Sequence, residues 1–194
     1  YRLKFNPGPE NLDHAGFIAL KEAVLRAAAH HGAQLFAYVI LHDISKDPDT
    51  ARRNGINSVC FHFNSYLSKV GGPGLVLIDQ FTDQGNLIAA HLRDKFTIGL
   101  TGMPYARELR LGNIVGFHYC AVGQGHFPSL VDVATGSLRF ALNACTREID
   151  GQRPTAFALL QLLSPLFHRH RADGPVSEWG FQFSPKIIKA AKYR

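Results

Sequence analysis

The chain has 194 residues, of which 46% are apolar, and lysine and arginine outnumber aspartate and glutamate by 21 to 15, for a formal net charge of +6. This length and composition favour one globular domain over residues 1–194, and the sequence has no run of about 18 apolar residues that would predict a membrane-spanning helix. The basic balance favours polyanionic partners such as nucleic acid.

The three cysteines indicate a reducing environment. Cys60, Cys120 and Cys145 lie far apart in apolar patterns and lack metal-type spacing, which fits buried free thiols. No basic and then apolar leader follows Tyr1. We therefore expect a cytoplasmic protein, and we expect further residues upstream of Tyr1.

The N-terminal third alternates between strand and helix patterns. Residues 2–5 are typical of a strand end, and apolar residues then recur at helical spacing from Asn11, the expected N-cap, to Gly32, the expected terminator. Residues 35–41 predict a buried strand that leads to Asp43. The polar residues 45–54 predict an exposed loop.

The next pattern predicts a helix with one apolar face. Ile56, Cys60, Phe63 and Leu67 recur at helical spacing, and Asn57 and His62 fall on other sides, where we expect solvent. A run of glycine and proline at residues 71–74 ends this helix.

Residues 74–81 predict the central strand. Four apolar residues in a row, 75–78, lie between that breaker run and a polar stretch, which is typical of a strand buried on both faces. In an open α/β sheet, functional groups gather where strands end. Asp79 at the exit of this strand is therefore a candidate catalytic residue, although a carboxylate that merely ends a strand has the same position.

The second half continues the alternation. Residues 87–92 predict a helix, residues 110–120 a strand, and residues 154–164 a helix that Pro165 stops. Pro128 suits the first turn of another helix, whose apolar stripe leaves Asp132 on a separate row with Gly136. The order of elements predicts an α/β fold with helices on both faces of a sheet.

Two of these stretches resemble a known bacterial family. Residues 77–79 read Leu-Ile-Asp and residues 129–136 read Ser-Leu-Val-Asp-Val-Ala-Thr-Gly. They are similar to the family called domain of unknown function thirty-eight hundred, in which an apolar strand ends in Asp and a late helix reads Gln-Leu-Ala-Asp-Leu-Ile-Ala-Gly. Residues 2–4 resemble a Glu-x-Lys stretch of that family, with Arg2 in place of the glutamate. The resemblance implies an RNase H-like mixed sheet whose first strand this chain lacks.

The resemblance also implies a metal-dependent nuclease. Clustered carboxylates in such a site hold one or two divalent ions, which activate water and stabilise the leaving oxygen of a phosphodiester. Asp79 and Asp132 would be the catalytic metal ligands, and their oxygen atoms suit Mg²⁺ or Mn²⁺. Arg2 keeps a second interpretation open, in which the domain is a binding or scaffold module of a larger assembly and does not hydrolyse its ligand.

Three further residues are candidate auxiliary groups. His126 precedes the Asp132 helix and would help to protonate a leaving group. Lys4 would contact phosphate, and Asp43 follows a buried strand as Asp79 does. Each also has a plain structural interpretation, as a loop histidine, a solvated lysine and a turn carboxylate.

Two alternatives involve Cys120. Cys120 and His118 would lie on one face of a strand, as a zinc pair requires, but no second pair has matching spacing. Cys120 as a nucleophile, with His118 or His126 as base, lacks an obvious third residue.

Residues 167–194 are expected to form a basic and aromatic C-terminal extension. Trp179, Phe181 and Tyr193 occur there among lysines, arginines and histidines, a composition suited to nucleic-acid binding by stacking and phosphate contacts. A solvated basic face beside a packed aromatic patch has the same composition. A homo-oligomer and a larger complex both remain open as assemblies.

Overall fold

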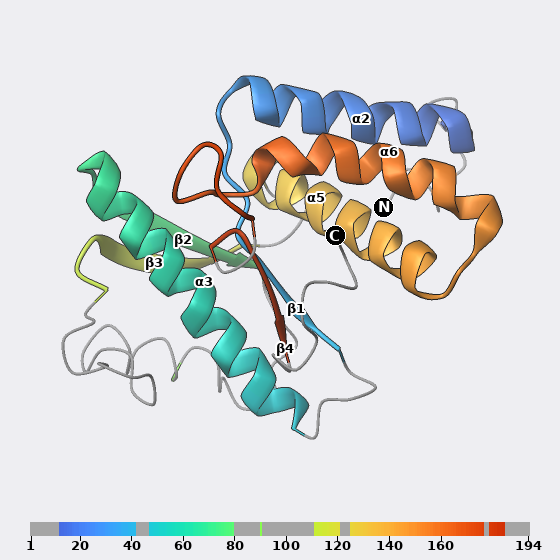
Figure 1. Cartoon of the computed structure of the whole chain (residues 1–194). Coiled ribbons are helices and arrows are strands. Elements are labelled where there is room, and N and C mark those ends of the chain that lie inside the picture. The colour runs from blue at the N-terminus through green and yellow to red at the C-terminus, as the bar shows by residue number, and fades with distance from the viewer. Residues whose placement is uncertain are drawn as a thin grey trace. The chain divides into compact units, whose positions relative to one another are not determined.

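The computed structural model describes residues 12–41, 47–79, 90, 111–120, 125–176 and 179–184. The chain divides into two compact units, whose elements are labelled in Figure 1. The helical unit comprises Tyr1–Gln34 and Gly125–Leu166, and the strand unit comprises Leu35–Gln124 and Phe167–Arg194. Each unit therefore joins an early and a late part of the chain.

The helical unit consists of α2 (His14–His30), α5 (His126–Thr146) and α6 (Arg153–Leu163), which lie side by side (Figure 1). Fully buried alanines on α5 and α6, among them Ala141 and Ala156, allow these two helices to approach closely. The largest fully buried apolar side chains of the unit are Leu25, Leu159 and Leu163. Each of these leucines contributes roughly 2 kcal/mol by leaving water.

The helix predicted to have Pro128 in its first turn and the helix predicted over residues 154–164 are confirmed. Ala134, Leu138 and Ala141 form the buried stripe of α5, as the spacing predicts. A 3₁₀ turn at Asp150–Gln152 leads into α6, and a second one at Ser164–Leu166, which contains Pro165, follows it. The sequence pattern was sufficient here because each helix buries a single face.

The limits of α2 confirm one expectation and correct another. Asp13 caps the helix, because its carboxylate accepts a hydrogen bond of 2.7 Å from the backbone N–H of Gly16. The predicted N-cap, Asn11, was wrong and itself lies outside the described residues. Gly32 follows the helix with a φ of 70°, a conformation that glycine adopts without strain.

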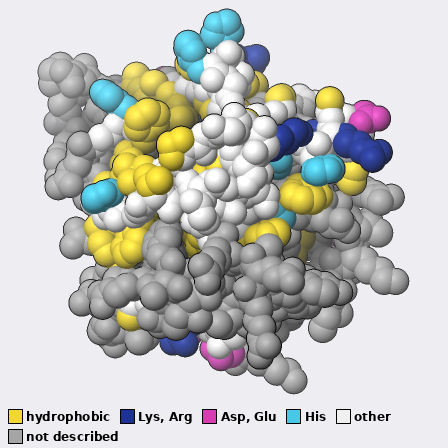
Figure 2. Space-filling model, turned by 90° about the vertical axis from the view of Figure 1, so that its left-hand side faces the viewer, with side chains coloured by type: hydrophobic (Ala, Val, Ile, Leu, Met, Phe, Trp, Pro, Cys, Tyr) yellow, Lys and Arg dark blue, Asp and Glu magenta, His cyan; other side chains and the backbone are white. Residues whose placement is uncertain are grey.

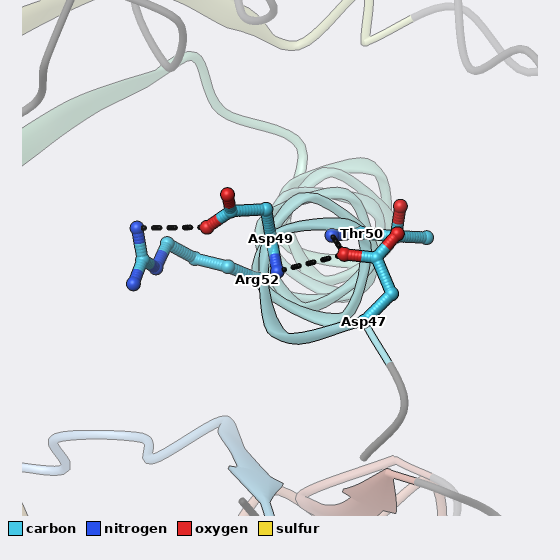
Figure 3. A network of polar contacts seen from close by, with 4 residues as sticks. All are labelled: Asp47, Asp49, Thr50 and Arg52. Atoms are coloured by element: carbon cyan, nitrogen blue, oxygen red, sulfur yellow. Dashed lines mark hydrogen bonds and ion pairs between the residues drawn. The ribbon is translucent and has the colours of Figure 1, made fainter.

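The predicted loop at residues 45–54 was wrong, because α3 (Pro48–Val70) already begins at Pro48. The Asp47 carboxylate accepts hydrogen bonds of 3.1 Å from the backbone N–H groups of Asp49 and Thr50, and Asp49 forms an exposed ion pair with Arg52 (Figure 3). A hydrogen bond from the side chain of Thr50 and, to a lesser degree, one from its backbone N–H group lower the pKa of Asp47. An aspartate cap followed by proline starts a helix despite the polar composition of the segment.

The strand unit contains two parallel strand pairs. Strand β1 (Ala37–Ile40) pairs with β4 (Phe181–Ser184), and β2 (Gly74–Asp79) pairs with β3 (Ile114–Cys120). Helix α3 contacts β1 in the same unit (Figure 1). The strands predicted within residues 35–41, 74–81 and 110–120 are therefore confirmed. Residues 2–5 and, apart from residue 90, which is helical, residues 87–92 lie outside the described residues.

Helix α3 is buried on more than one side, which the sequence did not predict. Its apolar residues Cys60 and Leu67 form a core with Leu111 and Ile114, against which residues of β2 and β3 pack. Asn57 and His62, expected in solvent, have only 7% and 8% of their surface exposed.

Strand β2 corrects the expectation of burial on both faces. Val76 and Ile78 pack against the core beneath α3, whereas Leu75 and Leu77 are 50% and 46% exposed. Because side chains alternate along a strand, β2 has one buried face and one open face.

The fold is mixed α/β, as the alternation predicts. Within the described residues it has four helices and short parallel strands in small sheets. No helix in the described part of the chain is long and apolar enough to cross a membrane.

Candidate functional site

The first candidate residue, Asp79, is the last residue of β2 and is exposed. In the parallel register Asp79 is paired with Cys120, and Leu77 with His118. Since side chains alternate along a strand, these four residues share one face, which is the open face of β2. Asp79 therefore has the position expected of a functional carboxylate, at the carboxyl end of a parallel strand.

The neighbouring Cys120 is a free thiol that makes one hydrogen bond to β2. Its Sγ donates a hydrogen bond of 3.5 Å to the carbonyl oxygen of Ile78, and the side chain is half-buried. All three cysteines are free, and burial raises the pKa of Cys60 to about 11.

The second candidate residue, Asp132, lies in the second turn of α5 and is exposed. Gly136, one turn further along, has no atom within 4 Å of the position that a Cβ would occupy. The row that contains both residues is thus open, as the spacing predicts. Within the described part of the chain, no hydrogen bond or ion pair occupies the Asp132 carboxylate.

The remaining sequence candidates are divided between described and undescribed residues. His126 is the first residue of α5 and is exposed, whereas Lys4 and Asp43 lie outside the described residues. Asp79 belongs to the strand unit, and Asp132 and His126 belong to the helical unit. Among the described residues, no three or more His, Cys, Asp or Glu side chains are grouped so that they could hold a metal ion.

A second cluster, which the sequence did not predict, surrounds His62 in the strand unit. We call it the histidine cluster, and it comprises Phe36, His62, Tyr66, His168, His170 and Trp179. The ring of Trp179 meets His62 edge-on with centroids 5.4 Å apart and stacks on His170 at 4.7 Å. Residues of α3, of the segment before β1 and of the segment before β4 therefore meet in one place.

The two buried histidines of this cluster favour the neutral state. Burial, and to a lesser degree the nearby His168, lowers the pKa of His62. The pKa of His168 is also lowered, chiefly by burial and to a lesser degree by the charges of Lys69 and His170. The sequence contained one signal of this cluster. Ser58, His62 and Tyr66 recur every four residues along α3 and therefore lie on one face of the helix.

A scan against protein-family models gives no match to this chain, and searches of the curated proteins and of the solved structures give no match either.

Proposed function

We propose that the chain is a metal-dependent nuclease that hydrolyses phosphodiester bonds of nucleic acid, with Asp79 and Asp132 as ligands of Mg²⁺ or Mn²⁺. The observation that carries the proposal is the exposed carboxylate of Asp79 at the carboxyl end of a parallel strand. The α/β class and the resemblance of residues 77–79 and 129–136 to an RNase H-like family support the same activity.

The donor atoms fit the proposed ion. Both side chains are exposed carboxylates, and Mg²⁺ prefers oxygen ligands and retains several water molecules. Such an ion, when bound, supplies an activated water and charge stabilisation for the leaving oxygen. His126, exposed at the start of α5, would donate the proton that the leaving group needs.

A nucleic-acid partner is supported by groups on the strand unit. His170 is exposed and stacks on Trp179, and the Nζ of Lys69 donates a hydrogen bond of 3.3 Å to the carbonyl oxygen of His170. Arg171 is exposed beside them. Figure 2 shows histidine side chains at the surface among hydrophobic, lysine and arginine side chains. Aromatic stacking of bases, with cations for the phosphates, is the usual chemistry of single-strand binding.

A second candidate function is nucleic-acid binding without hydrolysis, as a scaffold within a larger assembly. The observation in its favour is Arg2 at the place of the family's glutamate, since a cation disfavours a metal ion nearby. This alternative retains the contacts of His170, Trp179 and Lys69 and dispenses with the role of Asp79.

The two functions are separated by a cleavage assay on the intact chain. End-labelled single- and double-stranded DNA and RNA are incubated with the protein in Mg²⁺, in Mn²⁺ and in EDTA. The nuclease proposal predicts products with either metal and none with EDTA. Retention of an uncleaved strand in a gel-shift assay under every condition would establish the binding-only alternative, and cleavage that persists in EDTA would refute the metal requirement.

A further inference from the structure

Gln182 of β4 forms a side-chain bridge to two residues of α3. The hydroxyl of Ser58 donates a hydrogen bond to Gln182 Oε1, and Gln182 Nε2 lies 3.0 Å from His62 Nε2. The amide nitrogen carries only donors, so the facing nitrogen of His62 must accept. The proton of the neutral imidazole therefore lies on Nδ1, an atom that is buried and has no hydrogen-bond partner.

Within the described residues, the surroundings of His62 provide little compensation for a positive charge. Its side chain is 8% exposed and lies among the rings of Phe36, Phe61 and Trp179. Among the described residues, the titratable groups around His62 and His168 are Tyr66 and Lys69 of α3, and His168 and His170 of the segment before β4. These neighbours include cations and no carboxylate.

We propose that His62 is a pH-sensitive contact, which holds β4 and Trp179 against α3 only while its imidazole is neutral. Protonation of Nε2 would direct an N–H group at the amide N–H₂ group of Gln182, so that two donors meet. Rotation of the amide would let its oxygen accept from His62 and its N–H₂ group donate to the hydroxyl of Ser58, which can also accept, but it would still leave a cation buried beside His168. Acid therefore opens the contact between α3 and β4.

The sign of the pH dependence follows from the direction of the two shifts. The pKa values of His62 and His168 in the folded chain lie below their ordinary value of 6.5. The unfolded chain thus binds more protons than the folded chain as the pH falls below 6.5. The stabilisation is complete above that pH and declines as the pH decreases toward the folded pKa values.

Trp179 provides the signal for the test, because it is the chain's one tryptophan and contacts His62. Tryptophan fluorescence and the urea midpoint of the full chain are measured between about pH 7.5 and about pH 5.5. The parent is expected to show a lower urea midpoint and a changed Trp179 emission at the acidic end. His62→Gln can still accept from Gln182 but does not titrate, and it should show at most half of the parent's shift. His14→Gln, at an exposed position of α2, is the matched control and should shift as the parent does.

Two results would overturn this proposal. One is a His62→Gln variant whose midpoint shifts with pH as much as that of the parent. The other is a parent whose midpoint is the same at both ends of the range. If the His62→Gln chain does not fold, an NMR titration of the histidine ring protons in the parent decides, because a pKa of His62 at or above its ordinary 6.5 also contradicts the proposal. None of these readouts depends on nuclease activity, so the inference stands or falls separately from the proposed function.

Discussion

Replacement of Asp79 by asparagine is expected to reduce Mg²⁺-dependent cleavage by about 100-fold or more, which corresponds to about 2.7 kcal/mol of activation free energy. The amide has nearly the same size as the carboxylate but lacks its charge, and a hard cation prefers charged oxygen ligands. Asp79 is exposed at the end of β2 and has an interaction partner, so the variant's free energy of unfolding should change by no more than about 1 kcal/mol. Initial rates with a labelled oligonucleotide, measured beside urea unfolding curves, check both expectations.

Asp49→Asn is the matched control for this variant. Asp49 lies in the same unit as Asp79, and both side chains of its ion pair with Arg52 are exposed. Loss of this ion pair should therefore leave both activity and stability nearly unchanged. The same assay applied to Asp132→Asn should show a loss comparable to that of Asp79→Asn. If both aspartate variants cleave at the parental rate, neither side chain belongs to the mechanism.

Replacement of Gly180 by alanine is expected to lower the free energy of unfolding by about 3 kcal/mol. An added Cβ at this position would lie 2.4 Å from the carbonyl oxygen and 2.8 Å from the nitrogen of His168. Both are backbone atoms, so no side-chain rotation relieves the contact. The carbonyl oxygen of Gly180 also accepts from the N–H group of Ala37 at 2.8 Å, and a displaced backbone would therefore disturb the start of the β1–β4 pair.

Gly136→Ala provides the comparison, because an added Cβ in that helical position meets no atom within 4 Å. Alanine costs less conformational entropy than glycine in a helix, so this variant should be about 0.5–1 kcal/mol more stable than the parent. Urea denaturation monitored by circular dichroism measures both variants. A Gly180→Ala chain as stable as the parent would show that His168 and Gly180 do not approach each other this closely in solution.

The parts of the fold that the sequence predicts are those with a single buried face. The stripe of α5 and the terminator Gly32 depend on local spacing and local backbone conformation, both of which a sequence reveals directly. The start of α3 was missed because its residues are polar, although Asp47 and Pro48 carried the signal of a cap and a first turn. At this helix start, capping chemistry outweighs the polar composition of the segment.

The burial of His62 was missed for a different reason. Its partners Gln182 and Trp179 lie far away in the sequence, and a periodic pattern within one helix carries no information about them. In addition, a helix that packs on more than one side has more than one buried face, so its apolar stripe does not mark all of its buried residues. The candidate site was likewise predictable from the sequence only in part. Strand patterning predicted Asp79 at the exit of β2, which the structure confirms, whereas the joint action of Asp79 and Asp132 stays a prediction.

The most direct test of the proposed metal role is an NMR titration of the ¹⁵N-labelled chain with Mn²⁺, whose paramagnetism broadens the amide signals near a bound ion. The proposal predicts that signals around Asp79 and around Asp132 broaden together at substoichiometric Mn²⁺, and that excess Mg²⁺ reverses the effect. In the Asp79→Asn variant this broadening should be lost. Signals at both aspartates that stay sharp while Mn²⁺ is added, or that broaden equally in the parent and in Asp79→Asn, would contradict it.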